Sequence, residues 1–424
     1  MCASVAAVGA DARWLAALGG LIAHAGEVPS FIPYAEAPSE GWVNVPVLGE
    51  LVFHWLDALG GDRALVLAQA AAVAAMLALV ARDMRAAGAT DGARALVLLA
   101  VPFAAVASLF VVRVQLFSLP LFALAVLLLR AEARAPSYRI WLLVPLVALW
   151  SNLHGAVLTG LAIASVYLLV ERFRHDGLTA VGVFVASWLA LFATPALGRT
   201  GAYYLGVLHS EPATSGFGMW APLSLGSPFD VLFVAIGLPL LWLAIRARPR
   251  AWEFVCLVLL IAATVHVGRN SIWLLLFVAA PAASALRLRG RVRWNGAVRA
   301  AAWLVPVVLV VTALARTPVQ TVAGATLRAK AVSLAGGRPI LADPENAEQL
   351  ALDGQRVWIA NPIDAFTRSD QRVYLAWLKG DIALHDHDVV LVQLDSDVQQ
   401  RLGRDASFRE VARDDVAVLY RRAS

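Results

Sequence analysis

The feature that most constrains this chain is a succession of apolar segments between residues 64 and 315. Most are close to the roughly 20 residues that a helix needs to cross a bilayer, and the fourth is too short to span unaided. The segments are 64–82, 95–111, 114–130, 139–150, 155–171, 178–195, 229–246, 251–267, 270–286 and 297–315. The pattern predicts an α-helical polytopic membrane protein with about ten membrane segments.

Composition leads to the same class. Hydrophobic residues make up 60% of the 424 residues and charged residues only 15%, whereas about a quarter of the residues of a soluble domain are charged. The formal net charge is +5, but the arginines lie mostly in short connections between apolar segments. This charge therefore indicates membrane topology, and a nucleic-acid partner is not expected. Cys2 and Cys256 are too few for a disulfide framework or a cysteine metal cluster.

Every second connection is rich in arginine. The positive-inside rule assigns these connections to the cytoplasm. They contain Arg82, Arg85 and Arg94, then Arg130, Arg134 and Arg139, then Arg172 and Arg174, then Arg246, Arg248 and Arg250, then Arg287, Arg289, Arg291 and Arg293. The other connections are expected to face outward, and they contain residues 11–62, 113–115, 151–155, 196–228 and 269–270. Polar residues are thereby gathered on the extracytoplasmic side.

The first outward stretch contains two predicted helices. Residues 12–25 form an amphipathic pattern that ends at Gly26, and a connector rich in Pro, Gly and Glu follows through Gly41. Residues 46–59 predict a second helix with three polar side chains on one face, at Glu50, His54 and Asp57. Both helices are expected at the membrane interface.

The composition changes near Thr317, where short strand and helix patterns begin to alternate. The segment FREVARDDVAVLYRR reads as a terminal hairpin. We expect a small α/β domain, extracytoplasmic after an odd number of crossings. The predicted domains are a first extracytoplasmic loop with interfacial helices, a transmembrane helical domain and this α/β domain, at residues 1–62, 63–316 and 317–424.

Three groups of polar residues are candidates for chemistry, each with a simpler structural alternative. Arg113 with Gln115 fits either a clamp on a lipid phosphate or an ordinary interfacial arginine. The turn from Ser151 to Gly155 fits either part of a polar outer site or a hydrogen-bonded helix break. Asp11 and the carboxylates of residues 46–59 could supply a base or a metal ligand, or could be the wet face of an interfacial helix.

A fourth polar group, residues 385–388 (HDHD), resembles a metal-binding tract. Four polar residues ahead of a strand are more typical of a solvated loop, which is our interpretation. A Gly-rich phosphate loop ahead of a helix is missing from the sequence, so nucleotide binding has no support.

Several motifs in their order along the chain resemble a large group of bacterial polytopic membrane proteins, the GT-C-type glycosyltransferases and their relatives. The motifs are GEVPSFIPYAEAPSEGWVN, RVQLFSLPLFAL, LWSNLHGAVLTGL, TPALGRTGAYYL, WAPLSLGSPFD and RDDVAVLYRR. The resemblance covers nearly the whole chain. It implies a GT-C-like fold, a polyprenyl-phosphate-linked sugar donor, and an acidic residue in the first outer loop that acts as general base or metal ligand.

Carried over to this chain, the resemblance makes Asp11 the acid. The implied substrate-binding residues are Trp14, Arg113, Gln115, Asn152 and His154. The polar residues expected to face outward add Glu50 as a second catalytic candidate and Arg269 as a further substrate-binding candidate. Relatives commonly have a second acid where this chain has Gly9 and a histidine where it has Leu15. They also have an apolar span before the first acid, so the chain fits a divergent or N-terminally truncated member.

The expected activity is sugar transfer from the polyprenyl-phosphate donor to an envelope acceptor, on the outer face of the bacterial inner membrane. Asp11 would deprotonate the acceptor or hold a divalent cation, Mg²⁺ or Mn²⁺, while Arg113 and Arg269 would neutralise the donor phosphate. A non-catalytic GT-C-like binding or assembly protein is the first alternative. A transporter is the second, although few charges lie inside the apolar segments.

Overall fold

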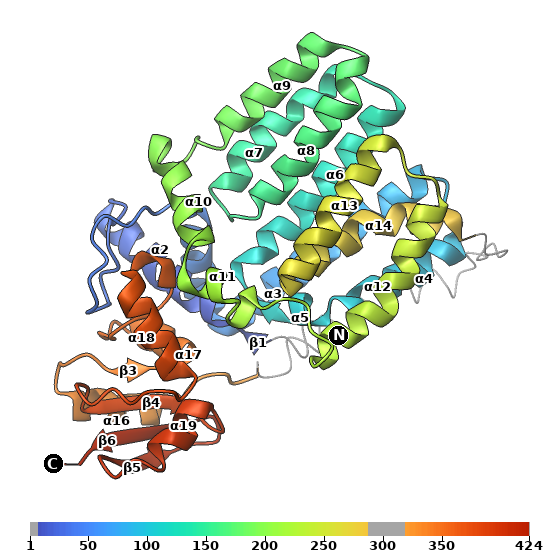
Figure 1. Ribbon diagram of the computed structural model, residues 1–424. Coiled ribbons are helices and arrows are strands. Elements are labelled where there is room, and N and C mark those ends of the chain that lie inside the picture. The colour runs from blue at the N-terminus through green and yellow to red at the C-terminus, as the bar shows by residue number, and fades with distance from the viewer. Residues whose placement is uncertain (1–6, 287–318, 424) are drawn as a thin grey trace. The chain divides into compact units, whose positions relative to one another are not determined.

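A computed structural model describes residues 7–286 and 319–423 of the protein (Figure 1). The described chain is mostly helical and forms two compact units. The helical unit comprises Val66–Thr194 and the described part of Gly218–Thr317. The mixed unit comprises Ala7–Leu65, Pro195–Phe217 and the described part of Pro318–Ser424.

Among the described residues, three helices are both long and apolar enough to cross a membrane, which indicates a membrane protein. They are Val47–Ala86 (α3), Val114–Arg134 and Pro228–Arg246. The other expected segments form shorter apolar helices where they are described, and residues 297–315 lie outside the described residues. Ten membrane segments and a GT-C fold therefore stay predictions.

The helical unit contains a bundle in which α7, α8 and α9 pack side by side (Figure 1). Several of its helices begin at polar N-caps, as at Thr90, Asp176 and Ser227, whose side chains accept a main-chain N–H three residues on. Its elements after α3 are α4 (Asp91–Ala104), α5 (Val106–Leu109), β2 (Val111–Val112), η1 (Val114–Phe117), α6 (Ser118–Arg134), η2 (Tyr138–Leu142), α7 (Leu143–Ser151), α8 (Val157–Val170), η3 (Arg172–Arg174), α9 (Gly177–Ala190), η5 (Gly218–Trp220), α12 (Pro228–Arg246), α13 (Ala251–His266), η6 (Gly268–Asn270) and α14 (Ser271–Ala285).

The mixed unit begins with β1 (Ala7–Val8), α2 (Ala10–Ala25) and the first part of α3 (Val47–Ala86). Helix α2 ends at Gly26, which has φ 71°, so the predicted helix end is confirmed. Helix α3 loses helical geometry at Gly60 and Gly61, where the predicted helix 46–59 ends. The later elements of this unit are η4 (Leu197–Arg199), α10 (Thr200–Leu208), α11 (Glu211–Ser215), α16 (Ala325–Ala335), β3 (Leu341–Ala342), α17 (Pro344–Leu352), η7 (Ile363–Ala365), α18 (Arg368–Leu378), β4 (Val389–Gln393), α19 (Asp397–Leu402), β5 (Phe408–Arg413) and β6 (Ala417–Arg422).

A four-stranded sheet forms the core of the C-terminal part of the mixed unit (Figure 1). Its strand order is β3-β4-β6-β5, with β3 parallel to β4 and the other pairs antiparallel. Four consecutive side chains of β4, from Val389 to Val392, are buried, as expected for a strand covered on both faces. The terminal hairpin expected from the sequence is β5 and β6.

The connector after α2 extends this C-terminal part. Val357 forms isolated parallel bridges with Ile340 on one side and with Ala35 on the other. The main chain of Val357 donates to Tyr34 (3.0 Å) and accepts from Glu36 (2.9 Å). Residues near the start of the chain are thereby hydrogen-bonded to a segment more than three hundred residues later.

The segment Pro195–Phe217 joins the rest of the mixed unit through polar contacts. Glu211 in α11 forms an ion pair with Arg372 in α18 (2.8 Å), and its main-chain N–H donates to Gln371 (2.8 Å). The Arg199 guanidinium donates to the carbonyl oxygen of Gly41 (2.8 Å). These contacts connect the segment to the earlier and the later parts of the unit's sequence.

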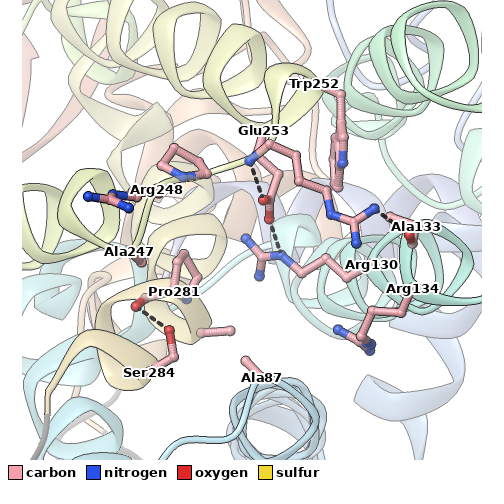
Figure 2. A pocket seen from close by; sticks show the side chains of 13 residues that line it. Ala87, Arg130, Ala133, Arg134, Ala247, Arg248, Trp252, Glu253, Pro281 and Ser284 are labelled. Atoms are coloured by element: carbon pink, nitrogen blue, oxygen red, sulfur yellow. Dashed lines mark hydrogen bonds and ion pairs between the residues drawn. The ribbon is translucent and has the colours of Figure 1, made fainter.

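A buried arginine holds four helices of the helical unit together. Arg130, 5% exposed, lies in the last turns of α6. It donates to Asp83 of α3 (2.6 Å) and to the carbonyl oxygen of Phe277 in α14 (2.7 Å). It also donates to Glu253 of α13 (2.9 Å), as Figure 2 shows. The positive charge of Arg130 is therefore balanced away from water by two carboxylates.

Replacing Arg130 by methionine should lower the free energy of unfolding by about 3–5 kcal/mol, because Asp83 and Glu253 would be left as buried charges without a cation. Denaturant-induced unfolding in detergent micelles measures the loss. Arg134→Met is the matched control, since Arg134 is exposed on the same helix. An equal loss in both variants would show that Arg130 has no special structural role.

Candidate functional site

A second buried arginine positions the start of the mixed unit. Arg13 of α2 is 2% exposed and follows the predicted acid Asp11 by two residues. Its guanidinium donates to four acceptors from separate parts of the sequence, namely Val8 O (3.0 Å), Asp62 Oδ2 (3.2 Å), Thr321 Oγ1 (3.4 Å) and Gln349 Oε1 (2.7 Å). The first turn of α2 is thereby attached to α17.

Glu50 is brought against α2 by a close helix contact. A Cβ atom at Gly19 would overlap the main-chain carbonyl of Glu50, so only glycine permits this packing. The Glu50 side chain is 0% exposed. One carboxylate oxygen accepts from Asn44 Nδ2 (2.8 Å), and the other has no hydrogen-bond partner among the described residues. Glu50 is therefore not part of a wet helix face.

A second buried glutamate, Glu348, comes from α17 and is 0% exposed. Asn361 Nδ2 donates to one of its oxygens, and the other oxygen has no partner in the described part of the chain. The Tyr34 hydroxyl donates to the carbonyl oxygen of Asn361 (3.1 Å). Tyr34 of the connector and Glu348 of α17 are therefore both hydrogen-bonded to Asn361.

Electrostatic interactions indicate that these acids are neighbours. Burial raises the pKa of Tyr34 well above its usual value, and the charges of Glu348 and Glu50 raise it further. Burial also raises the pKa of Glu348, with a further contribution from the charge of Asp11. The pKa of Asp364 is raised to about 6, mainly by burial, against the lowering effect of a main-chain hydrogen bond.

We refer to four acids as the carboxylate cluster: Asp11, Glu50, Glu348 and Asp364. Tyr203 lies beside it, since the charges of Asp364, Glu50 and Asp11 all contribute to raising the pKa of that buried phenol. Asp11 is partly exposed, whereas Glu50 and Glu348 are fully buried. Neighbouring carboxyl groups in such different surroundings are suited to proton transfer.

Glu348 and Asp364 were not among the residues that the sequence indicated. Glu348 stands in a short helix with several polar residues, PENAEQLAL, where a glutamate is usually solvated. Asp364 lies in a single 3₁₀ turn that follows a proline. The burial of Glu348 depends on contacts with distant parts of the chain, which no local pattern reveals.

The residues of the cluster do not fit a divalent cation. Within residues 7–286 and 319–423, no three His, Cys, Asp or Glu side chains converge closely enough to hold a metal ion. The described residues around Asp11 therefore lack the set of ligands that a Mg²⁺ or Mn²⁺ ion would need there.

The other predicted substrate-binding residues belong to the helical unit, except Trp14, which is 7% exposed in α2. His154 Nδ1 is hydrogen-bonded to Ser118 Oγ (2.7 Å), and the same hydroxyl accepts from Trp150 Nε1 (2.7 Å). Because Ser118 follows Gln115 by three residues, the Arg113 motif and the His154 turn lie close together.

Arg269 lies near the same turn. Its guanidinium carbon is 3.9 Å from the centre of the Trp220 ring, and its charge adds to the desolvation that lowers the pKa of His154 to about 3. The amide of Asn152 instead donates to the carbonyl oxygens of Ala148 (2.8 Å) and Ala193 (2.7 Å), as expected for a hydrogen-bonded helix break.

The pKa shifts of Glu348 and Asp364 predict that stability falls as pH rises. Both carboxyl groups bind protons more tightly in the folded than in the unfolded protein. Their contribution is therefore fully present below about pH 4 and is lost as pH rises through the folded-state pKa, about 6 for Asp364.

The double variant Glu348→Gln with Asp364→Asn should reduce this dependence. Between about pH 5 and about pH 8, the Tm of the unmodified protein should fall by several degrees more than that of the variant. Asp381→Asn, at an exposed aspartate of the same unit, is the control and should keep the original slope. Equal slopes in all three proteins would show that the two acids are not protonated in the folded state.

No protein-family model and no curated protein matches the chain. Its function is therefore inferred from the geometry of the carboxylate cluster and of the Arg269 and His154 region.

Proposed function

We propose that the protein is a GT-C-like glycosyltransferase that moves a sugar from a polyprenyl-phosphate-linked donor to an envelope acceptor. The observation that carries the proposal is the carboxylate cluster. Glu50 and Glu348 each retain one buried oxygen without a partner among the described residues. A buried polar atom of this kind costs free energy, and a ligand hydroxyl could satisfy it.

In the proposed reaction Asp11 is the general base. The acceptor hydroxyl gives its proton to the Asp11 carboxylate while its oxygen forms a bond to the anomeric carbon of the donor sugar. The bond between that carbon and the phosphate oxygen breaks, and polyprenyl phosphate leaves with the electron pair. Asp11 suits this role because it is the partly exposed acid beside two fully buried ones.

The departing phosphate needs positive charge, since that is where negative charge develops. Arg113 and Arg269 are the candidates for this task, because the arginine alternation predicts them on the same side of the membrane as Asp11. The Trp220 ring fixes Arg269 by cation–π stacking. The Arg113 side chain is half-buried and forms no hydrogen bond or ion pair with any described residue. His154, with its lowered pKa, would be neutral and could donate a hydrogen bond to a phosphate oxygen.

The side of the membrane on which we expect the reaction follows from the alternation of arginine-rich and arginine-poor connections along the chain. We propose that the cluster and the C-terminal domain face the extracytoplasmic side of the bacterial inner membrane, where lipid-linked sugars would be consumed. The bilayer and the donor lipid are then the principal partners.

A non-catalytic binding or assembly protein is the second candidate. The observation that favours it is that Asn44 and Asn361 already hydrogen-bond to Glu50 and Glu348. These acids would then maintain a binding surface, and no proton transfer would be needed.

Sugar transfer in membranes from a radiolabelled polyprenyl-phosphate donor distinguishes the two candidates. Asp11→Asn should lower the rate about 10²–10⁴-fold, the range typical of a lost general base. Arg269→Gln should lower it as well, because the leaving phosphate loses a cation.

The control is Asp381→Asn, which should retain the original rate. Full activity in both Asp11→Asn and Arg113→Ala would rule out the proposed mechanism. A complete lack of transfer by the unmodified protein, with donor binding retained, would favour the non-catalytic candidate.

A further inference from the structure

The helical unit contains a pocket of about 170 Å³ that none of the proposed catalytic residues lines. It is formed by the end of α6, the connection between α12 and α13, and the later part of α14. Figure 2 shows Arg248 on one side of the pocket and Arg130 and Arg134 on the other, with Ser284 at its edge. The lining is thus rich in arginine.

Two of the four lining arginines are occupied by protein groups. Arg130 is bound by Asp83 and Glu253. Arg250 pairs with Glu171 (2.9 Å) and donates to the carbonyl oxygen of Ala133. The other two, Arg134 and Arg248, have no hydrogen bond or ion pair through their side chains with any described residue.

The pocket carries more positive than negative charge. Among the described residues, its four guanidinium groups pair with three carboxylates, those of Asp83, Glu171 and Glu253, so one positive charge is left over. Arg248 is also held at φ 57°, a left-handed conformation that a residue with a side chain seldom adopts. The chain therefore keeps an unpaired cation at the pocket at some conformational cost.

We propose that this pocket binds a singly charged phosphate group, such as the phosphodiester of an anionic lipid or a free phosphate. The planar guanidinium groups of Arg134 and Arg248 would each donate two hydrogen bonds to its oxygens. The volume exceeds the share of one water, about 30 Å³, but is below the roughly 300–1,000 Å³ of sites for larger organic ligands. A headgroup phosphate fits this range.

The pocket is independent of the proposed sugar transfer. Arg134 and Arg248 belong to the connections that the positive-inside rule assigns to the cytoplasm, whereas Asp11 belongs to an outward stretch. A failure of one proposal leaves the other unaffected.

Binding to the full-length protein in neutral detergent tests the proposal with two probes, phosphatidylglycerol in mixed micelles and inorganic phosphate. The unmodified protein should bind at least one of them saturably. Arg134→Gln with Arg248→Gln should weaken this binding about tenfold or more, since hydrogen bonds to charged groups are lost. The single variants should lie between, and they replace the double variant if it does not fold.

The matched control is Arg139→Gln with Arg174→Gln, which removes the same charge from exposed arginines outside the pocket. It should leave the affinity for either probe nearly unchanged. Binding of phosphatidylglycerol alone would identify a lipid site, and binding of inorganic phosphate alone would identify a soluble phosphate ester. Equal weakening in both double variants, or binding of neither probe, would overturn the proposal.

Discussion

The interaction on which the mixed unit depends is the burial of Arg13. A guanidinium removed from water is stable only when acceptors surround it, and here the acceptors come from the start of the chain, from α3 and from the C-terminal part. Asp11 lies two residues before Arg13, and Glu348 lies one residue before the acceptor Gln349. Arg13 connects the parts of the unit, and its hydrogen bonds therefore also help to position Asp11 and Glu348 of the carboxylate cluster.

Burying the carboxylates of the cluster costs free energy, and apolar side chains could pack there without that cost. Apolar residues in place of Glu50 and Glu348 would leave no unsatisfied carboxylate oxygens there. Buried acids with raised pKa values occur at functional sites more often than elsewhere, because proton transfer needs groups that titrate near the working pH. Arg130 differs from these acids, because its partners satisfy it and its role is to join helices.

Local patterns in the sequence predicted the local elements. The helix that ends at Gly26 and the terminal hairpin of β5 and β6 both follow from periodicity and turn residues. The acids of the cluster were harder to predict. The helical period put Glu50 on one face with His54 and Asp57, but its burial depends on the close approach that Gly19 permits.

Contacts between distant residues could not be predicted in the same way. Arg13 and Gln349 are separated by 336 positions, and no periodicity relates them. Glu348 is buried for the same reason, since the residues around it come from both ends of the chain. The predicted roles of Asp11, Trp14, Arg113 and Gln115 remain predictions.

Photo-crosslinking tests most directly whether the carboxylate cluster receives the donor sugar. The probe is a polyprenyl-phosphate sugar that carries a diazirine on the sugar ring, and mass spectrometry maps the labelled peptides. We expect labels on the peptides that contain Asp11, Tyr34 and Glu348, and we expect unlabelled donor to compete. Labels confined to peptides of the apolar helices, or labels that excess donor does not reduce, would contradict this role of the cluster.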